Sequence, residues 1–148
     1  MIKKTISYED YNGEKITEDF YFNLSKAELM EMNFQASGGL ENYARSIMNA
    51  RDTASMMAIY KDLLLKSYGI KTPDGKHFMK TEQIRTEFEC SPAFSELYTE
   101  LLTDDVAAAE FFNGVIPKDL AEDPHLKKLF NKEGKNVQLL SEQVGNTN

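Results

Sequence analysis

The chain has 148 residues, 41% of them hydrophobic and 11% aromatic, a composition typical of a folded globular domain rather than a disordered chain. One cysteine, Cys90, excludes an internal disulfide, and without a signal-peptide pattern or a run of transmembrane length we expect a cytosolic protein. The net charge of −7 equals that of segment 82–110, where eight acids accompany one base. This acidity argues against nucleic-acid binding and fits a solvated face or, alternatively, a surface for a basic protein partner.

The first predicted element is a β-hairpin. Apolar and polar residues alternate over 2–8 and again over 16–24, and a Tyr-Asn-Gly loop ending at Gly13 separates the two stretches. A two-residue loop would place the two apolar sets on opposite faces. A three-residue loop, with Gly13 in the left-handed conformation of a G1 bulge, would instead set Tyr8 opposite Ile16. The sequence therefore predicts the bulged hairpin.

Two helices are predicted next. Ser25 and Glu28 have the spacing of a capping box, and Leu24 and Leu29 have that of a hydrophobic staple, so a helix should begin here and end near residue 34. A Ser-Gly-Gly sequence follows, and a second helix is expected from Leu40.

A long central helix is predicted from an N-cap at Asp52, with Gly69 as the left-handed residue that ends it. The segment 72–75, Thr-Pro-Asp-Gly, is typical of a turn, and 76–80 is too short to assign but could be extended. The apolar stripe of this helix would consist of Met56, Tyr60, Leu63, Leu64 and Ser67.

Three shorter helices complete the predicted body. Thr81, Ser91 and Thr103 are the candidate N-caps, and Pro92 follows Ser91 in the favoured order. The middle helix has a strict apolar stripe of Phe94, Leu97, Tyr98, Leu101 and Leu102. The last helix, ending at Gly114, should bury Val106, Ala109 and Phe112.

Together these elements predict an α+β fold, mostly α, with an N-terminal β-hairpin packed on a bundle of about five to six helices. Residues 1–117 should form a single compact domain. Residues 118–148 are more polar, and we expect a C-terminal extension that is partly disordered.

Catalytic and metal chemistry find little support in the sequence. The Glu-x-x-His spacing at 122–125 lacks the second pair that a carboxylate metal site needs, and a proline interrupts it. Segment 69–76 has the wrong glycine spacing for a phosphate loop. Cys90 and His77 lack a third catalytic group, so Cys90 is interpreted as a core residue. We expect no catalytic residues, no metal and no cofactor.

Binding is the remaining class of function. The seven methionines could form an adaptable binding surface, but most lie at core spacing, notably Met32, Met48 and Met56, so we favour a core role for most of them. One aromatic run cannot be buried whole by a single helix face, and it is either a core plug or an exposed patch for a partner. The candidate partner-binding residues of this run are Phe111, Phe112, Val115 and Ile116.

Three stretches within residues 1–117 resemble the tail assembly chaperones of long-tailed phages and prophages of Gram-positive hosts. They are TISYEDYNGEKITEDFYFNLSKAEL, KDLLLKSYGIKTPDGKHFMK and FECSPAFSELYTELLTDDVAAAEFFNGVIP. The resemblance implies a non-catalytic assembly factor in the host bacterial cytoplasm, absent from the mature virion, that binds the tape measure protein. It also implies a frameshifted longer form in many such phages, and the helical body would permit a homo-oligomer.

Two alternatives from other classes stay open. One is a structural phage tail component, which would be incorporated into particles. The other is an acidic inhibitor of a basic host protein, which would bind in a salt-sensitive manner.

Overall fold

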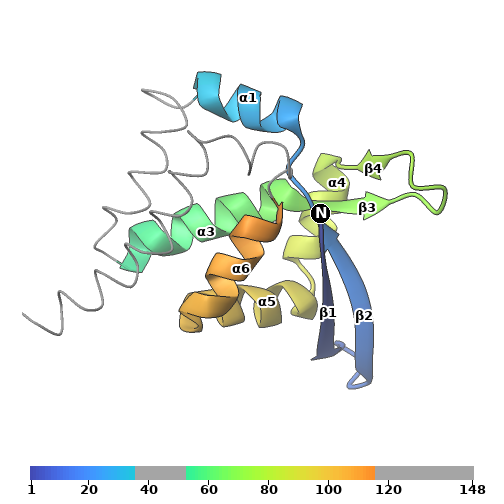
Figure 1. Ribbon diagram of the computed structural model, residues 1–148. Coiled ribbons are helices and arrows are strands. Elements are labelled where there is room, and N and C mark those ends of the chain that lie inside the picture. The colour runs from blue at the N-terminus through green and yellow to red at the C-terminus, as the bar shows by residue number, and fades with distance from the viewer. Residues whose placement is uncertain (36–52, 116–148) are drawn as a thin grey trace, which may run out of the picture.

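The computed structural model describes residues 1–35 and 53–115, which form an antiparallel four-stranded sheet and five helices (Figure 1). The helix-rich α+β prediction is confirmed, and the sheet is larger than predicted because a second hairpin joins the first. The predicted helix from Leu40 and the extension 118–148 lie outside the described residues, so the boundary at 117 stays a prediction. The elements are β1 (Ile2–Glu9), β2 (Lys15–Phe22), α1 (Lys26–Gln35), α3 (Thr53–Ser67), β3 (Tyr68–Lys71), β4 (Phe78–Met79), α4 (Glu82–Glu89), α5 (Pro92–Thr103) and α6 (Asp105–Val115).

The first hairpin has the predicted register. Tyr8 lies opposite Ile16, and Gly13 has a φ of 82°. The Asp10 N–H donates to the Glu14 carbonyl oxygen at 2.8 Å, and the Gly13 N–H donates to the Asp10 carbonyl oxygen at 3.0 Å. The bulged loop therefore places both apolar sets on one face, toward the helices.

The end of α3 differs from the prediction. Gly69 does not end a helix in a left-handed conformation; it lies in β3, opposite Tyr21 of β2. The helix ends at Ser67 and β3 follows directly at Tyr68, because pairing with β2 holds the chain there in an extended conformation. Gly69 serves instead as a close-approach site. A Cβ at this position would lie 2.7 Å from a ring carbon of Phe78.

Three predicted N-caps are confirmed. Ser25 and Glu28 form the reciprocal capping box of α1, each side chain accepting from the other residue's N–H at 3.1 Å. Thr81 accepts from the Ile84 N–H at the start of α4, and Ser91 starts α5, with proline at its first turn. Local hydrogen bonding encoded in the sequence therefore sets these helix starts.

The cap of α6 was wrongly assigned. α5 continues to Thr103, whose hydroxyl donates to the Thr99 carbonyl oxygen at 2.8 Å, and Asp104 caps α6 instead. The buried stripe of α6 consists of Ala108, Phe111 and Val115. Val106, predicted to be buried, is 66% exposed, because the fit of Phe111 into the core sets the rotation of the helix.

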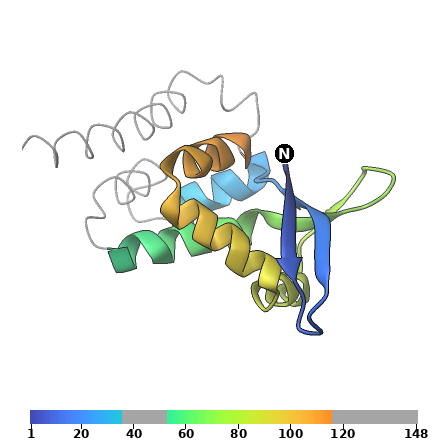
Figure 2. The same cartoon turned by 90° about the horizontal axis from the view of Figure 1, so that it is seen from below.

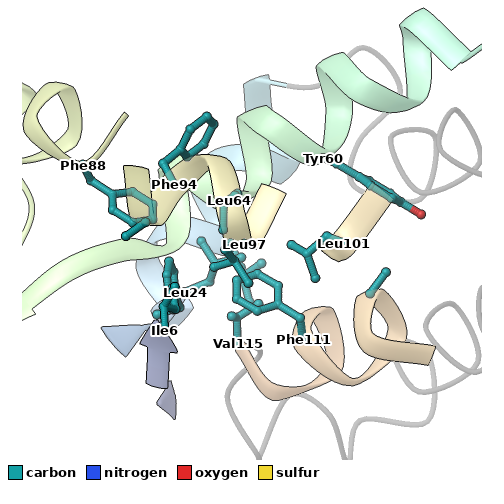
Figure 3. Close-up of a cluster of buried hydrophobic side chains, with 14 residues drawn as sticks. Ile6, Leu24, Tyr60, Leu64, Phe88, Phe94, Leu97, Leu101, Phe111 and Val115 are labelled. Atoms are coloured by element: carbon teal, nitrogen blue, oxygen red, sulfur yellow. The ribbon is translucent and has the colours of Figure 1, made fainter. Parts of the chain in front are cut away.

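The core lies between the inner face of the sheet and the helices, which gather on one side of the β1–β2 hairpin (Figures 1 and 2). Its centre is Phe22, which is fully buried. Ring centroids of Phe111 and Phe88 lie 5.1 and 5.7 Å from that of Phe22, and Tyr68 stacks on Phe88 at 4.1 Å. The predicted stripe of α5 supplies Leu97 and other residues of the same cluster (Figure 3).

Candidate functional site

The predicted partner-binding residues lie at the end of α6 and differ in burial. Phe111 and Val115 are 1% and 2% exposed and belong to the core cluster (Figure 3). Phe112 is half-buried, with its ring centroid 5.1 Å from that of Tyr60, and Ile116 lies outside the described residues. Phe111 and Val115 are thus core residues rather than parts of an exposed patch. A role of this group in partner binding stays a prediction.

Methionines dominate the exposed apolar surface instead. Of the seven large hydrophobic residues that are exposed in the described ranges, four are methionines. The expectation that most of the seven methionines are core residues is wrong, because these four are exposed, while Met32 does pack against the core. The side chains of Met48 and Met56 lie outside the described residues. The exposed four are Met1 (53%), Met30 (60%), Met57 (38%) and Met79 (45%).

A methionine is unbranched and polarizable, so an exposed group of them can adapt to irregular apolar surfaces. Sequence spacing could not reveal them, because their exposure depends on which faces of their elements the rest of the fold covers. The signal available in the sequence was their number, seven in a chain of 148 residues.

β3 and β4, with the turn between them, form a projecting hairpin that we name the arm (residues 68–79; Figure 1). The predicted turn is confirmed. Thr72 donates from its hydroxyl to Asp74 Oδ1 at 2.6 Å, the Lys76 N–H donates to the same oxygen at 3.0 Å, and Gly75 has a φ of 74°. These hydrogen bonds, that of Thr72 first, hold the pKa of Asp74 below its usual range. The turn is therefore held in one conformation.

The arm carries an uncovered apolar pair. Ile70 and Met79 lie directly opposite each other on one face and are 47% and 45% exposed. Lys71 and Lys76, both exposed, lie beside the pair along the chain, and Lys71 Nζ is 4.8 Å from the centroid of the Tyr21 ring. The arm is thus a basic and apolar projection on an acidic protein.

Lys80, at the base of the arm, joins three elements. Its ammonium donates to the carbonyl oxygens of Asn23 and Lys66, at 2.6 and 2.8 Å, and to Glu28 Oε2 at 2.7 Å. Burial lowers the pKa of Lys80. Burial alone would raise the pKa of Glu28, but hydrogen bonds from Lys80 and Ser25 outweigh it and leave that pKa below its usual value. Lys80 thereby ties α1 to the end of α3 and to β2.

The candidate chemical groups do not converge on a site. Within residues 1–35 and 53–115, no three His, Cys, Asp or Glu residues are placed to hold a metal ion, and the 122–125 motif lies outside these ranges. Cys90 is exposed, contrary to the core interpretation, because Phe88 takes the buried position near the end of α4. His77 belongs to the turn of the arm, where its main chain bonds to Thr72.

A family model described as phage tail assembly chaperone matches residues 1–146. The chain belongs to the phage tail assembly chaperone family. This confirms the resemblance found in the sequence, and the match continues past residue 117, where that resemblance ended. No curated protein and no solved structure matches the chain.

A tail assembly chaperone acts on other proteins, so the surfaces that it exposes are the candidate functional regions. The candidate functional site is therefore the set of exposed methionines together with the arm. In the described part of the chain, no helix is long and apolar enough to cross a membrane.

Proposed function

We propose that the chain is a non-catalytic chaperone that binds the tape measure protein and keeps it soluble while the phage tail is assembled. It would act in the host bacterial cytoplasm, without a cofactor, and would be absent from the mature virion. A frameshifted longer form could share the task. Family membership supports the general role in tail assembly.

The observation that carries this proposal is the exposure of flexible thioether side chains on separate elements. Met30 lies on α1, Met57 on α3 and Met79 on β4, and each is at least 38% exposed. A long helical partner with apolar stretches offers an irregular surface, which methionines can follow by changing rotamer. The tape measure protein must later be released from the chaperone. Several separate moderate contacts suit such a partner, because the total affinity stays well below the affinity ceiling.

The acidic segment 82–110 would support solubility of the loaded complex. Its excess negative charge gives each bound copy a like-signed surface, which opposes aggregation of neighbouring complexes. The negative charge would therefore help to keep the complex soluble even where it does not contact the tape measure protein.

The test compares a triple variant with a matched control in cells that also express the tape measure protein. We expect Met30→Ser with Met57→Ser and Met79→Ser to lower the soluble fraction of the tape measure protein several-fold. The variant should keep its fold, because none of the three side chains is buried. Tyr11→Ser removes an 87% exposed apolar residue from the hairpin loop and should leave the soluble fraction unchanged.

Two results would separate the parts of the proposal. If the wild-type chain itself leaves the tape measure protein insoluble, the proposed function is wrong. If the triple variant keeps the tape measure protein as soluble as the wild type does, the assignment of the exposed methionines as binding residues is wrong. Phe112→Ala would then test the exposed part of the α6 run. Phe111→Ala is unsuitable for this purpose, because loss of a buried ring would unfold part of the population.

A further inference from the structure

We propose that an uncovered part of the sheet, toward the loop end of the β1–β2 hairpin, binds basic side chains of the tape measure protein, arginine above all. The inference rests on the proposed function and adds the chemistry of one contact to it. We name this surface the aromatic-acidic face. It consists of Tyr8 of β1, Glu18 and Phe20 of β2, Tyr68 of β3 and Glu87 of α4.

The described helices leave this part of the inner sheet face uncovered. Residues two apart on a strand point to the same face, so Glu18 and Phe20 share the face of the fully buried Phe22. Glu18 is nevertheless exposed, and Phe20 is half-buried. The nearest stretch of α5 packs against β1 instead, where Glu100 lies 3.4 Å from Lys4 Nζ. The exposure of Glu18 therefore marks a part of the inner face that is open to a partner.

Three half-buried aromatic rings form the apolar part of this face. The ring centroids of Tyr8 and Tyr68 lie 6.5 and 6.4 Å from that of Phe20. Phe88, which is buried in the core (Figure 3), supports two of them, because Tyr68 stacks on it at 4.1 Å and Phe20 lies 5.6 Å from it. Aromatic rings carry negative charge on their faces and attract guanidinium and ammonium groups. The rings are thus held in place and leave part of their surface to a cation.

Two carboxylates give the face its negative charge. The Tyr8 hydroxyl donates to Glu18 Oε1 at 2.8 Å, and Gln83 Nε2 donates to Glu87 Oε1 at 3.0 Å. Burial raises the pKa of Tyr68, and the charges of Glu18 and Glu87 raise it further, so both carboxylates act on the same ring. Within residues 1–35 and 53–115, no ion pair involves either acid. The face therefore carries a charge that no described cation neutralises.

Rings and carboxylates in this arrangement fit a basic side chain. Arginine fits best, because its planar guanidinium can stack on a ring and also donate two hydrogen bonds to a carboxylate. Segment 82–110, which includes Glu87, carries a charge equal to the whole net charge of −7, and its field favours the approach of a basic partner. A basic stretch of the tape measure protein is the occupant that this charge selects.

Retention of the tape measure protein on the immobilised chain, after co-expression, tests the proposal. Glu18→Gln with Glu87→Gln removes both charges but keeps the oxygen atoms that accept from Tyr8 and Gln83, so the fold should persist. We expect this double variant to retain about tenfold less tape measure protein than the wild type, or less still. Wild-type retention should also fall when salt is raised from about 0.05 to about 0.5 M.

A matched control excludes a general effect of net charge. Glu9→Gln with Glu96→Gln makes the same charge change at exposed positions outside the face, Glu9 lying on the opposite side of the sheet, and it should retain as much as the wild type. The proposal is overturned if the double variant of the face retains as much as the wild type, or if this control loses as much. A wild type that retains no tape measure protein would instead contradict the proposed function itself.

Overlapping peptides that cover the tape measure protein test the chemistry of the occupant. The purified wild-type chain should bind peptides that contain arginine, and replacement of those arginines by citrulline, which is neutral and nearly the same shape, should abolish binding. Binding that survives citrulline would overturn the proposal.

Sedimentation velocity of the purified chain tests a second copy as the occupant. The wild type and the double variant should show the same mass distribution, and a change in the variant would make the face a contact between copies and the proposal wrong.

Discussion

Replacement of Lys80 by methionine should be the most destabilising change of a charged residue in the described structure. The side chain of Lys80 is 14% exposed, and its ammonium uses three donors on two carbonyl oxygens and one carboxylate. Methionine keeps most of the aliphatic volume, so the change isolates the loss of the charge and its hydrogen bonds.

The size of the loss in the free energy of unfolding depends on the polar groups that remain without the Lys80 ammonium. Removing one partner of a buried ion pair costs about 3–5 kcal/mol, because the other charge and the carbonyl oxygens lose their donor. The side chain of Glu28 is 34% exposed, so water replaces part of the lost interaction. We expect a loss of about 3 kcal/mol in the free energy of unfolding, which corresponds to a fall of about 10 °C in Tm for a domain of this size.

Urea unfolding followed by circular dichroism measures this loss. Lys76→Met, at an exposed position of the arm, is the matched control and should change stability by less than about 0.5 kcal/mol. Glu28→Gln should cost less than Lys80→Met, and the double variant should cost less than the sum of the two. A loss below about 1 kcal/mol for Lys80→Met, or full additivity with Glu28→Gln, would refute the reasoning.

Three further predictions concern single positions. The folded-state pKa of Glu28 lies below its ordinary value of 4.5, so this carboxylate contributes stability at neutral pH that is lost as pH falls through the folded pKa. When the free energy of unfolding is measured over an acid series, Glu28→Gln should therefore lose less stability than the wild type. Gly69→Ala should destabilise the fold by about 1–3 kcal/mol, because the added methyl meets the Phe78 ring. Gly75 has a φ of 74° and a Cβ there would meet no atom within 4 Å, so Gly75→Ala should cost about 1 kcal/mol through backbone strain alone. Equal falls in Tm for the two variants would contradict this order. Asp104→Ala should cost about 1 kcal/mol through loss of the α6 cap, and an unchanged Tm would rule out that role.

The sequence was most informative where hydrogen bonding is local. Gly13 set the hairpin register because only one loop length puts both apolar sets on one face. The caps at Ser25, Thr81 and Ser91 followed for the same reason, since an N-cap depends on residues within one turn. The stripe of α5 was also predicted, because its period is regular over three turns.

Predictions failed where distant residues decide. Gly69 follows a helix and so fits a helix stop, but strand pairing with β2 and the approach of Phe78 determine its conformation. Val106 fits an apolar stripe, but the depth of Phe111 in the core rotates it outward. The small β4 strand has only two residues, too few for any period to show.

The candidate site was the least predictable part. Burial of Phe111 and exposure of Met30 or Met79 depend on which faces neighbouring elements cover, and the composition of each element alone does not contain that information. What the sequence did contain was the excess of methionine and the uneven charge, and both describe the surface that the structure shows.

The most direct measurement is co-expression with the tape measure protein of the same genome, followed by size-exclusion chromatography with light scattering. We expect the tape measure protein to be insoluble when expressed alone and to elute with this chain as a soluble complex of defined mass. A tape measure protein that still aggregates, while this chain elutes by itself, would contradict the central claim.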